Sequence, residues 1–266
     1  MTSYLRTRIR DVLPADLQVP AKYWYGWARR RLEPEMDMLA LIARPGERVI
    51  DVGGNRGVYA YKLWKLGCAV EVFEPNPACC AILEAWSRGK GEVRLHPVAL
   101  SSHQGEAKLH IPVDENGVEH DASASLEHGF GGFRDQAVAT RTLDSFGFTD
   151  AALIKIDVEG HEQSVLAGAA QTLAASHPAL LIEIEQRHNA NPIHRIFEGI
   201  ESGGYRGFFL DPKTGILRPL EEFRLERDQS MERFGADNAR YINNFLFLHE
   251  RHIADGKYRA LKLPTR

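Results

Sequence analysis

The sequence lacks any apolar run approaching the roughly 20 residues that a membrane-spanning helix requires. Several arginines stand near the first residue, but the apolar segment of a signal peptide does not follow them, so we expect a protein that is not exported. An excess of positive charge is also missing, because the formal net charge is −3. This balance argues against a dedicated nucleic-acid binder, which usually carries a basic excess.

Cysteine is scarce as well. The three cysteines, Cys68, Cys79 and Cys80, are odd in number and clustered, and their spacing is not that of metal ligands. Cys79 shares a helical face with Ile82 and Leu83, which favours a role as a small core residue. A reduced, cytoplasmic protein is the simplest interpretation of this cysteine usage.

What remains is an ordinary globular composition, 44% hydrophobic and 26% charged, in a chain of 266 residues. This length suits one large domain with an extension. We divide the chain into an N-terminal helical extension over 1–45, a main domain over 46–250 and a basic C-terminal tail over 251–266. We expect the tail to be a solvated end rather than a binding patch.

The extension is expected to hold an aromatic helix and a second helix at 35–43. Trp24, Trp27 and Leu32 are placed to form one apolar stripe beside several arginines. A basic aromatic helix can lie on a membrane surface. Packing against the main domain, where the helix would wall the active site, is the favoured alternative.

The most informative stretch is 49–57, which reads VIDVGGNRG. Apolar residues and an acid are followed by three glycines within five positions, and then by apolar residues at helical spacing. This pattern predicts a strand, a tight turn and a helix, the first unit of a doubly wound α/β sheet. Ligands of such sheets bind beyond the carboxyl ends of the strands, and glycine lets the backbone approach them closely.

Further strands are expected along the whole main domain, at 69–73, 92–95, 152–156, 179–184, 208–210 and 244–248. Two β-rich segments, 106–111 and 137–142, are expected to pair as an inserted hairpin. The long loop between them, 112–134, is typical of a functional or mobile segment, such as a lid over a substrate. Its polar candidates are either lid or surface residues: His120, Asp121, Ser123, Ser125 and His128.

The glycine turn does not match the Gly-x-Gly-x-x-Gly fingerprint of dinucleotide-binding proteins, because Asn55 and Val58 stand where glycines are required. A phosphate-binding P-loop is excluded too, since no Gly-Lys-Ser/Thr follows. Asp51 closes the first strand and Glu74 closes the second, where an acid can accept hydrogen bonds from a ribose. S-adenosylmethionine fits these residues, because it offers a ribose to Glu74, a cationic ammonium and sulfonium to Asp51, and no phosphate.

The chain resembles the FkbM-family methyltransferases, which belong to the class I S-adenosylmethionine-dependent enzymes. The stretches that carry the resemblance are VIDVGGNRG at 49–57, FEPNP at 73–77, ALS at 99–101, TLDS at 142–145, LIKIDVEGHE at 153–162 and LIEI at 181–184. The resemblance covers residues 33–185. It implies a Rossmann-like seven-stranded sheet with the last strand antiparallel, and methyl transfer to a hydroxyl, often of a sugar or a natural product.

The resemblance and the strand ends together give the expected cofactor site. Its candidate residues are Asp51, Gly53, Gly54, Asn55, Gly57, Glu74, Pro75, Asn76, Ala99, Leu100 and Asp157. The family often has alanine where this chain has Gly54, a change between small residues.

Methyl transfer from a sulfonium is an in-line displacement, in which a base or a metal would help the acceptor hydroxyl to lose its proton. Asp157, Glu159 and His161 follow the fourth strand and are the candidate catalytic residues. The alternative for Glu159 is an acid that stabilises a helix start, and a structural role is the favoured alternative for His161. A divalent metal at Asp157 and Glu159 is left open. At the end of the fifth strand, Glu183 and its neighbours Glu185 and His188 are either substrate contacts or solvated loop.

We therefore predict a cytoplasmic S-adenosylmethionine-dependent O-methyltransferase that acts on a small-molecule or glycan acceptor. A nicotinamide-dependent oxidoreductase is a rival, disfavoured by the failed glycine spacing. A non-catalytic protein that kept the fold is another. Nucleic-acid amino-methylation is disfavoured, because such enzymes commonly carry an Asn/Asp-Pro-Pro-aromatic motif where this chain has DVEG at 157–160.

Overall fold

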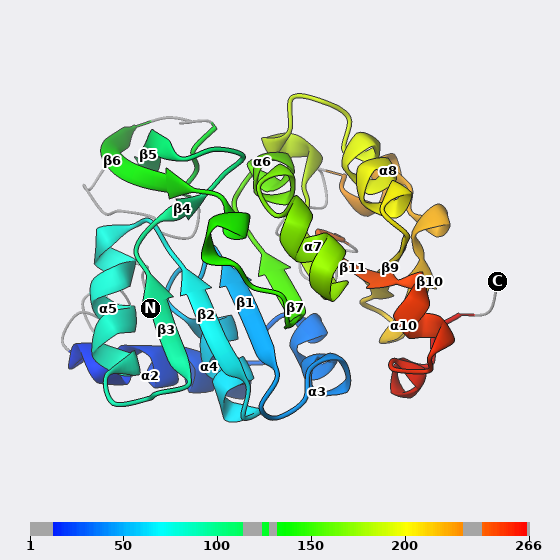
Figure 1. The fold of residues 1–266 in the computed structure, drawn as a ribbon, viewed down its shortest axis with the longest axis horizontal. Helices are drawn as coiled ribbons and strands as arrows, with labels where there is room; N and C mark the ends of the chain where they lie inside the picture. Colours follow the sequence, from blue (N-terminus) through cyan, green and yellow to red (C-terminus); the bar gives the residue numbers. More distant parts are fainter. Residues whose placement is uncertain (1–12, 114–123, 128–131, 231–240, 265–266) are drawn as a thin grey trace.

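The computed structural model describes residues 13–113, 124–127, 132–230 and 241–264. Within these residues, eight strands form one sheet in the order β10-β9-β11-β8-β7-β1-β2-β3 (Figure 1). The strands are β1 Arg48–Val52, β2 Ala69–Phe73, β3 Val93–His96, β7 Ala151–Ile156, β8 Ala179–Glu183, β9 Tyr205–Asp211, β10 Ile216–Pro219 and β11 Asn244–His249.

The direction of the strands follows the prediction, with one addition. Strands β1, β2, β3, β7 and β8 are parallel to one another. The last strand of the chain, β11, inserts between β8 and β9 and is antiparallel to both. The predicted antiparallel last strand is thus confirmed, and β10, which pairs antiparallel with β9, extends the expected seven strands to eight.

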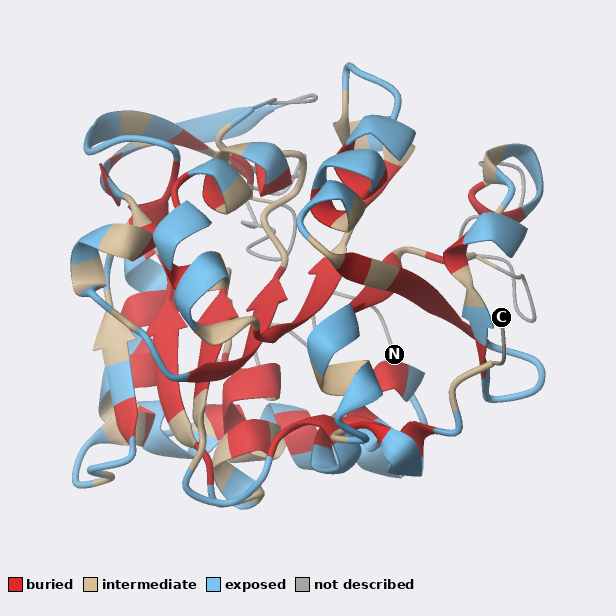
Figure 2. Ribbon diagram, turned by 45° about the vertical axis from the view of Figure 1, so that its right-hand side comes forward, coloured by how far each residue is buried: buried red, intermediate tan, exposed pale blue. Residues whose placement is uncertain are grey.

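The central strands are buried on both faces, as parallel strands covered by helices should be (Figure 2). Since successive side chains of a strand point to opposite faces, Val49 and Leu153 enter one core while Ile50 and Ile154 enter the other. The first core packs under α2 Ala15–Ala28, α4 Val58–Lys65 and α5 Pro77–Ser87; the second packs under α6 Glu162–Ala167, α7 Ala170–Ser176 and α8 His194–Ser202.

The N-terminal extension packs on its own domain. Val19 and Tyr23 of α2 are buried in the first core, whereas Trp24 and Trp27 are 45% and 61% exposed. The buried face of the helix is therefore not the expected tryptophan stripe. The second expected helix is broken into a 3-10 turn, η1 Pro34–Asp37, and a short helix, α3 Leu39–Ile42.

The inserted hairpin is present and gains a third strand. Strand β5 Gly105–Pro112 pairs antiparallel with β6 Phe133–Arg141, and β4 Ala99–Leu100 pairs with β6 on its other edge. This small sheet lies above the carboxyl ends of β1, β2 and β3 (Figure 1). Of the expected loop candidates, Ser125 is described and bridges to His110. His120, Asp121, Ser123 and His128 lie outside the described residues.

The C-terminal segment differs from the expected solvated end. Tyr258 and Leu261 are buried in the first core, beside α10 Glu250–Ala254 and η7 Arg259–Leu261.

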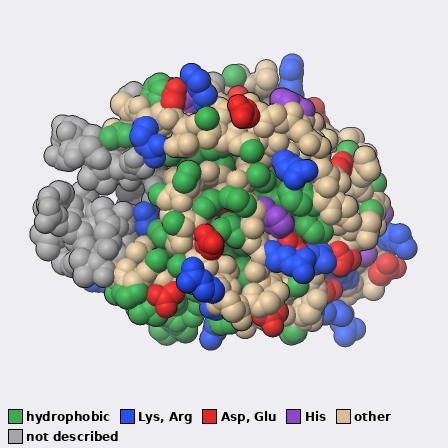
Figure 3. Space-filling model, turned by 60° about the vertical axis from the view of Figure 1, so that its left-hand side comes forward, with side chains coloured by type: hydrophobic (Ala, Val, Ile, Leu, Met, Phe, Trp, Pro, Cys, Tyr) green, Lys and Arg blue, Asp and Glu red, His purple; other side chains and the backbone are tan. Residues whose placement is uncertain are grey.

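The remaining short elements are η3 Leu143–Phe146, η4 Gln186–His188, η5 Leu220–Glu222 and α9 Leu225–Asp228. None of the helices described is long and apolar enough to cross a membrane. On the face shown in Figure 3, apolar side chains gather near the centre, with basic and acidic side chains interspersed around them.

Candidate active site

The glycine turn after β1 joins the ends of two strands. Gly53 has a φ of +77°, a conformation that favours glycine, and a Cβ added there would lie 1.8 Å from the backbone oxygen of Asp157. Its amide, like that of Gly54, donates a hydrogen bond to the Phe73 carbonyl, at 2.9 and 3.1 Å. The turn therefore needs glycine so that the ends of β1, β2 and β7 can meet.

Gly57, a candidate cofactor residue, stands where the turn passes into the following helix. It is the N-cap of α4, with a φ of +75°, and a Cβ there would lie 2.7 Å from Leu83 and 3.1 Å from Val19. It does not line the pockets that contain Gly53. Its glycine lets α2 and α5 pack closely against the start of α4.

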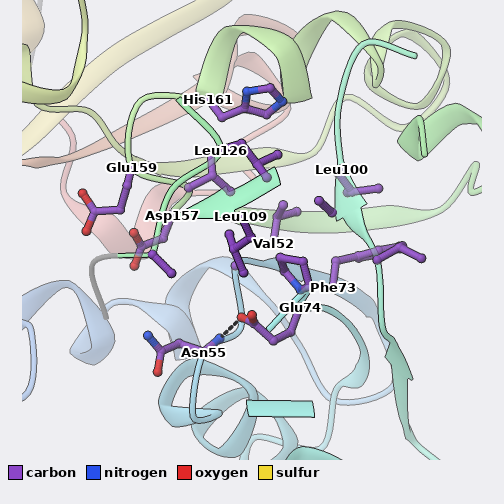
Figure 4. Close-up of a pocket in the computed structure, with 16 residues that line it drawn as sticks. Val52, Asn55, Phe73, Glu74, Leu100, Leu109, Leu126, Asp157, Glu159 and His161 are labelled. Carbon is purple, nitrogen blue, oxygen red and sulfur yellow. Dashed lines mark hydrogen bonds between the residues drawn. The ribbon is translucent and has the colours of Figure 1, made fainter. Parts of the chain in front are cut away.

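Glu74 stands at the end of β2 with its carboxylate held by backbone amides. One oxygen accepts a hydrogen bond from the Asn55 amide at 2.6 Å (Figure 4), and the other accepts from the Asn76 amide at 2.7 Å. The side chain of Asn76 in turn caps α5 by accepting from the Ala78 amide. Asn76 therefore supports the carboxylate from behind, while Glu74 and Pro75 line the pocket.

A pocket lies at these strand ends, and most of its wall is apolar. Its lining residues are Val52, Gly53, Asn55, Phe73, Glu74, Pro75, Val98, Ala99, Leu100, Leu109, Ala124, Leu126, Asp157, Val158, Glu159 and His161. We call it the first pocket. In Figure 4, Asp157 and Glu159 lie on one side of the view and Phe73 and Leu100 on the other. The expected residues Ala99 and Leu100 are joined by Leu109 and Leu126, which the inserted sheet and its loop supply.

His161 connects the inserted loop to the main sheet. Its Nδ1 lies 2.5 Å from a carboxylate oxygen of Glu127, and its Nε2 lies 3.1 Å from the hydroxyl of Ser101. The Ser125 hydroxyl adds a hydrogen bond to the backbone oxygen of Glu159 at 2.7 Å. Both ring nitrogens of His161 are thus engaged, and the side chain is buried. This geometry suits a clamp on the pocket better than a base.

A second pocket opens on the other side of Gly53, Asn55 and Asp157, the residues that it shares with the first pocket. The N-terminal extension supplies one wall of this second pocket, and the strand ends supply the floor. Its other lining residues are Lys22, Tyr25, Gly26, Arg31, Leu32, Glu33, Met36, Asp51, Gly54, Arg56, Val58, Tyr59 and Lys155.

Glu33 ties the extension to the far end of the chain. Its Oε2 accepts hydrogen bonds from the Tyr59 hydroxyl at 2.5 Å and from the Asn244 amide at 3.1 Å. Lys155, which is 1% exposed, lies beneath, with its ammonium 3.9 Å from Asp157 and over the ring of Tyr59. No local pattern in the sequence indicates Glu33, because its partners are remote in the chain.

The cleft is rich in buried carboxyl groups. Burial, together with repulsion from Asp157, raises the pKa of Asp51 to about 7, although Lys155 opposes this shift. Burial and repulsion from Glu159 raise the pKa of Asp157 to about 6, and burial and repulsion from Asp157 raise the pKa of Glu183 to about 9; Lys155 opposes both shifts. Burial lowers the pKa of Lys155, but the surrounding carboxylates outweigh it and raise that pKa above its ordinary value. Such a site favours a bound cation.

Asp51 combines deep burial with an incompletely hydrogen-bonded carboxyl group. It is 2% exposed, and its Oδ2 is buried without a hydrogen-bond partner among the described residues. A buried polar atom with no partner is costly, since it loses water without gaining another contact. The atom belongs to a residue that lines the second pocket, so a donor group of a ligand bound there can satisfy it.

The end of β8 brings three more groups to the rim. His188 Nε2 lies 2.7 Å from Glu159 Oε2, and the Glu185 carboxylate accepts hydrogen bonds from Arg187 at 2.6 and 2.9 Å. In the part of the chain that the structure describes, Glu159, Glu185 and His188 are the residues whose ligand atoms cluster as a metal site requires. Asp157, where a metal shared with Glu159 was left open, is not part of this cluster.

A doubly wound sheet with a ligand cleft at its carboxyl edge defines a Rossmann-like protein of the kind that binds a nucleotide-containing cofactor. The chain belongs to the FkbM methyltransferase family, since the family model of the methyltransferase FkbM domain matches residues 51–206. The match includes the glycine turn, Glu74, Asp157 and the end of β8. It leaves out the N-terminal extension and β11.

Two curated relatives match the chain over part of their length. The 2-O-methyltransferase NoeI of Sinorhizobium fredii is 28% identical over 158 residues, which cover 53% of this chain and 65% of NoeI. The hexuronic acid methyltransferase AglP of Haloferax volcanii is 30% identical over 153 residues, which cover 55% of this chain and 61% of AglP. The chain thus spans less than two thirds of either relative.

Among solved structures, the chain is similar to an FkbM methyltransferase from Methylobacillus flagellatus KT. The TM-score is 0.47 and the sequence identity 15%, with 91% of this chain and 57% of that chain covered.

Proposed function

We propose that this chain is an S-adenosylmethionine-dependent O-methyltransferase that methylates a hydroxyl of a sugar, either in a small molecule or in a glycan. Membership of the FkbM methyltransferase family supports methyl transfer. The names of its relatives, a 2-O-methyltransferase and a hexuronic acid methyltransferase, support a sugar hydroxyl as the acceptor.

The observation that carries the proposal is the pair of acids, Asp51 and Glu74, on two sides of one glycine turn. Glu74 is fixed by two amides at the first pocket, where it accepts hydrogen bonds from the ribose hydroxyls. The apolar wall from Phe73 to Leu126 takes the adenine. The buried, unpartnered oxygen of Asp51 takes the ammonium of the methionine part, and Asp157 lies beside the sulfonium.

The acceptor then occupies the second pocket, against the wall that the extension supplies. In the transfer, an acceptor oxygen attacks the methyl carbon and forms the new C–O bond. The bond between carbon and sulfur breaks, and its electron pair stays on sulfur, which leaves a neutral thioether. We assign the hydroxyl proton to Asp157, which lines both pockets and whose pKa of about 6 suits a base at neutral pH.

Three expected site residues take supporting roles in this proposal. His161 positions the inserted loop over the first pocket, because both its ring nitrogens are engaged. Gly57 allows close helix packing, and Asn76 holds Glu74 in place. Glu159 remains on the acceptor side with His188.

The test is methyl transfer from labelled S-adenosylmethionine to a panel of mono- and oligosaccharides. We expect a methyl ether and S-adenosylhomocysteine in equal amounts. The Asp157→Asn variant should bind the cofactor by calorimetry but lose about 10²- to 10⁴-fold in rate, as removal of a general base does. The exposed Asp255→Asn variant is the control.

Three outcomes would contradict the proposal. Failure of the parent protein to bind S-adenosylmethionine removes the cofactor assignment, and binding of NAD in its place revives the oxidoreductase. Binding without turnover on any acceptor indicates a non-catalytic protein.

A further inference from the structure

We propose that Glu159, Glu185 and His188 form a divalent-metal site on the acceptor side of the cleft. Each residue offers one ligand atom, and these atoms all lie within 4.8 Å of one another. They come from two neighbouring strand ends: Glu159 follows β7, whereas Glu185 and His188 follow β8. Parallel strands bring their carboxyl ends to one edge, so the cluster lies next to Asp157.

His188 and Glu159 already contact each other within this cluster. Nε2 of His188 is buried and lies 2.7 Å from Oε2 of Glu159, so the two side chains form an ion pair when the imidazole is protonated. This contact holds both side chains at one place, and an ion that binds both must replace the proton between them, since metal ligands bind in their deprotonated forms.

The backbone of Glu159 holds its side chain in this place at a conformational cost. The residue has a φ of +48°, a left-handed conformation that is uncommon outside glycine. Gly160 follows with a φ of +100°, and a Cβ on it would lie 2.4 Å from the backbone oxygen of His188. The tight turn thus brings Glu159 directly against the segment that carries His188. Strain of this kind concentrates at functional sites.

Glu185 is oriented by its own neighbours, as metal-binding carboxylates are. Arg187 donates to both of its oxygens, and the Tyr241 hydroxyl donates to one of them. A carboxylate has about four lone-pair positions, which these contacts and a further side-chain hydrogen bond with Glu183 occupy, so a metal would displace one of these donors. Arg187 is the local competitor of a metal, but the neighbouring Asp157 adds negative charge beside Glu159.

The donor set indicates the kind of ion. Two carboxylate oxygens and one imidazole nitrogen suit Mg²⁺ or Mn²⁺, which prefer about six ligands in octahedral geometry. About three positions then remain for water and for acceptor oxygens. This part of the inference rests on the proposed function: a sugar with adjacent hydroxyls can place two oxygens on such an ion. The ion would lower the pKa of the hydroxyl that is methylated.

The experiment is a titration of the full chain with Mn²⁺, without cofactor or acceptor, followed by calorimetry and by electron paramagnetic resonance. We expect a single ion per chain. The His188→Gln and Glu159→Gln variants should each weaken binding about 10- to 100-fold or more, since even the residues behind metal ligands have effects of this size. The exposed His103→Gln variant, outside the cluster, is the matched control.

Thermal melting and S-adenosylmethionine binding, measured on the same samples, show that each variant is folded. Absence of stoichiometric Mn²⁺ binding by the parent overturns the proposal, and so does a His188→Gln variant that binds as tightly as the parent. The two proposals fail separately: cofactor binding without metal binding removes only the metal site. Metal binding without cofactor binding leaves the metal site and removes the methyltransferase.

Discussion

The two sides of the cleft are built in different ways. The cofactor side consists of a strand, a glycine turn and a second strand end that are close in the sequence, and the family match, which begins at residue 51, covers the turn and the second strand end. The acceptor side is assembled from the extension, the end of β8 and β11, and Glu33 and Asn244 lie outside the matched residues. In the proposed function, the family match thus covers the turn on the methyl-donor side and leaves out part of the acceptor side.

The largest expected effect is on stability, and it tests the glycine turn where the ends of β1, β2 and β7 meet. Gly53→Ala should cost at least about 4 kcal/mol of unfolding free energy, because its Cβ meets the Asp157 backbone oxygen at 1.8 Å. Gly147 is the matched control: it also has a positive φ but nothing within 4 Å of an added Cβ, so Gly147→Ala should cost about 1–2 kcal/mol. Urea unfolding measures the loss of unfolding free energy in both variants. Equal losses would show that the backbone around Gly53 relaxes to accept the added Cβ.

The next effect is confined to the cofactor side. Glu74→Gln should weaken S-adenosylmethionine binding about 10- to 100-fold, since hydrogen bonds to a charged group contribute about 1.5–3 kcal/mol. Glu84→Gln, on the exposed face of α5, should leave the affinity unchanged. Isothermal calorimetry gives both dissociation constants. Unchanged affinity in Glu74→Gln would show that this carboxylate does not bind the ribose of the cofactor.

The buried acid on the same side predicts a pH dependence. Asp51 has a pKa of about 7 when folded against 3.8 as its ordinary value, so the folded state favours the protonated form. The protonated Asp51 therefore stabilises the ligand-free protein fully below pH 3.8. This contribution to the unfolding free energy is lost as the pH rises from 3.8 through 7. Melting at pH 5–8 should show falling stability, with Asp51 contributing up to about 1.4 kcal/mol per pH unit.

This slope provides two internal checks. The Asp51→Asn variant should have a shallower slope, whereas the exposed Asp255→Asn should keep that of the parent. Bound S-adenosylmethionine should restore stability at high pH, because its ammonium compensates the ionised carboxylate. An identical slope in Asp51→Asn would assign the pH dependence to the other buried acids.

A smaller effect should fall on the acceptor side alone. Glu33→Ala removes the hydrogen bonds from Tyr59 and Asn244, which amount to about 1 kcal/mol each. We expect the KM for the acceptor to rise about fivefold, while the affinity for the cofactor stays within about twofold. Tyr59→Phe, which removes one of the two bonds, should lie between. Equal loss on both sides of the cleft would mean that the extension supports the whole site.

The smallest effect concerns the clamp between the inserted loop and the sheet. His161→Gln should weaken cofactor binding about two- to fivefold and leave the pH–rate profile unchanged, because a clamp contributes packing and about one hydrogen bond but no proton transfer. If His161→Gln instead abolished turnover and removed the part of the pH–rate profile that reflects titration of the base, His161 would be the catalytic base.

The division also explains what the sequence could predict. The stretch at 49–57 and the acid at Glu74 are local patterns, so the sheet, the turn and the acids followed from spacing. The burial of Tyr258 did not, because it depends on contacts with remote residues of the first core. Strand β10 pairs with the adjacent β9, but its four residues are too few for alternation to predict a strand. His161 stands beside the strand-end acids in sequence, yet its partners Ser101 and Glu127 arrive from other segments and point it elsewhere.

The bond between Glu33 and Asn244 has a consequence for the order of assembly. The two residues are 211 positions apart. At about 5–20 residues per second of synthesis, Glu33 leaves the ribosome about 10–40 s before its partner. The methyl-donor half can be in place during that interval, but the acceptor wall closes only once β11 has inserted. A nascent chain stopped before β11 therefore carries a complete glycine turn beside an extension that packs on the first core but lacks its contact with Asn244.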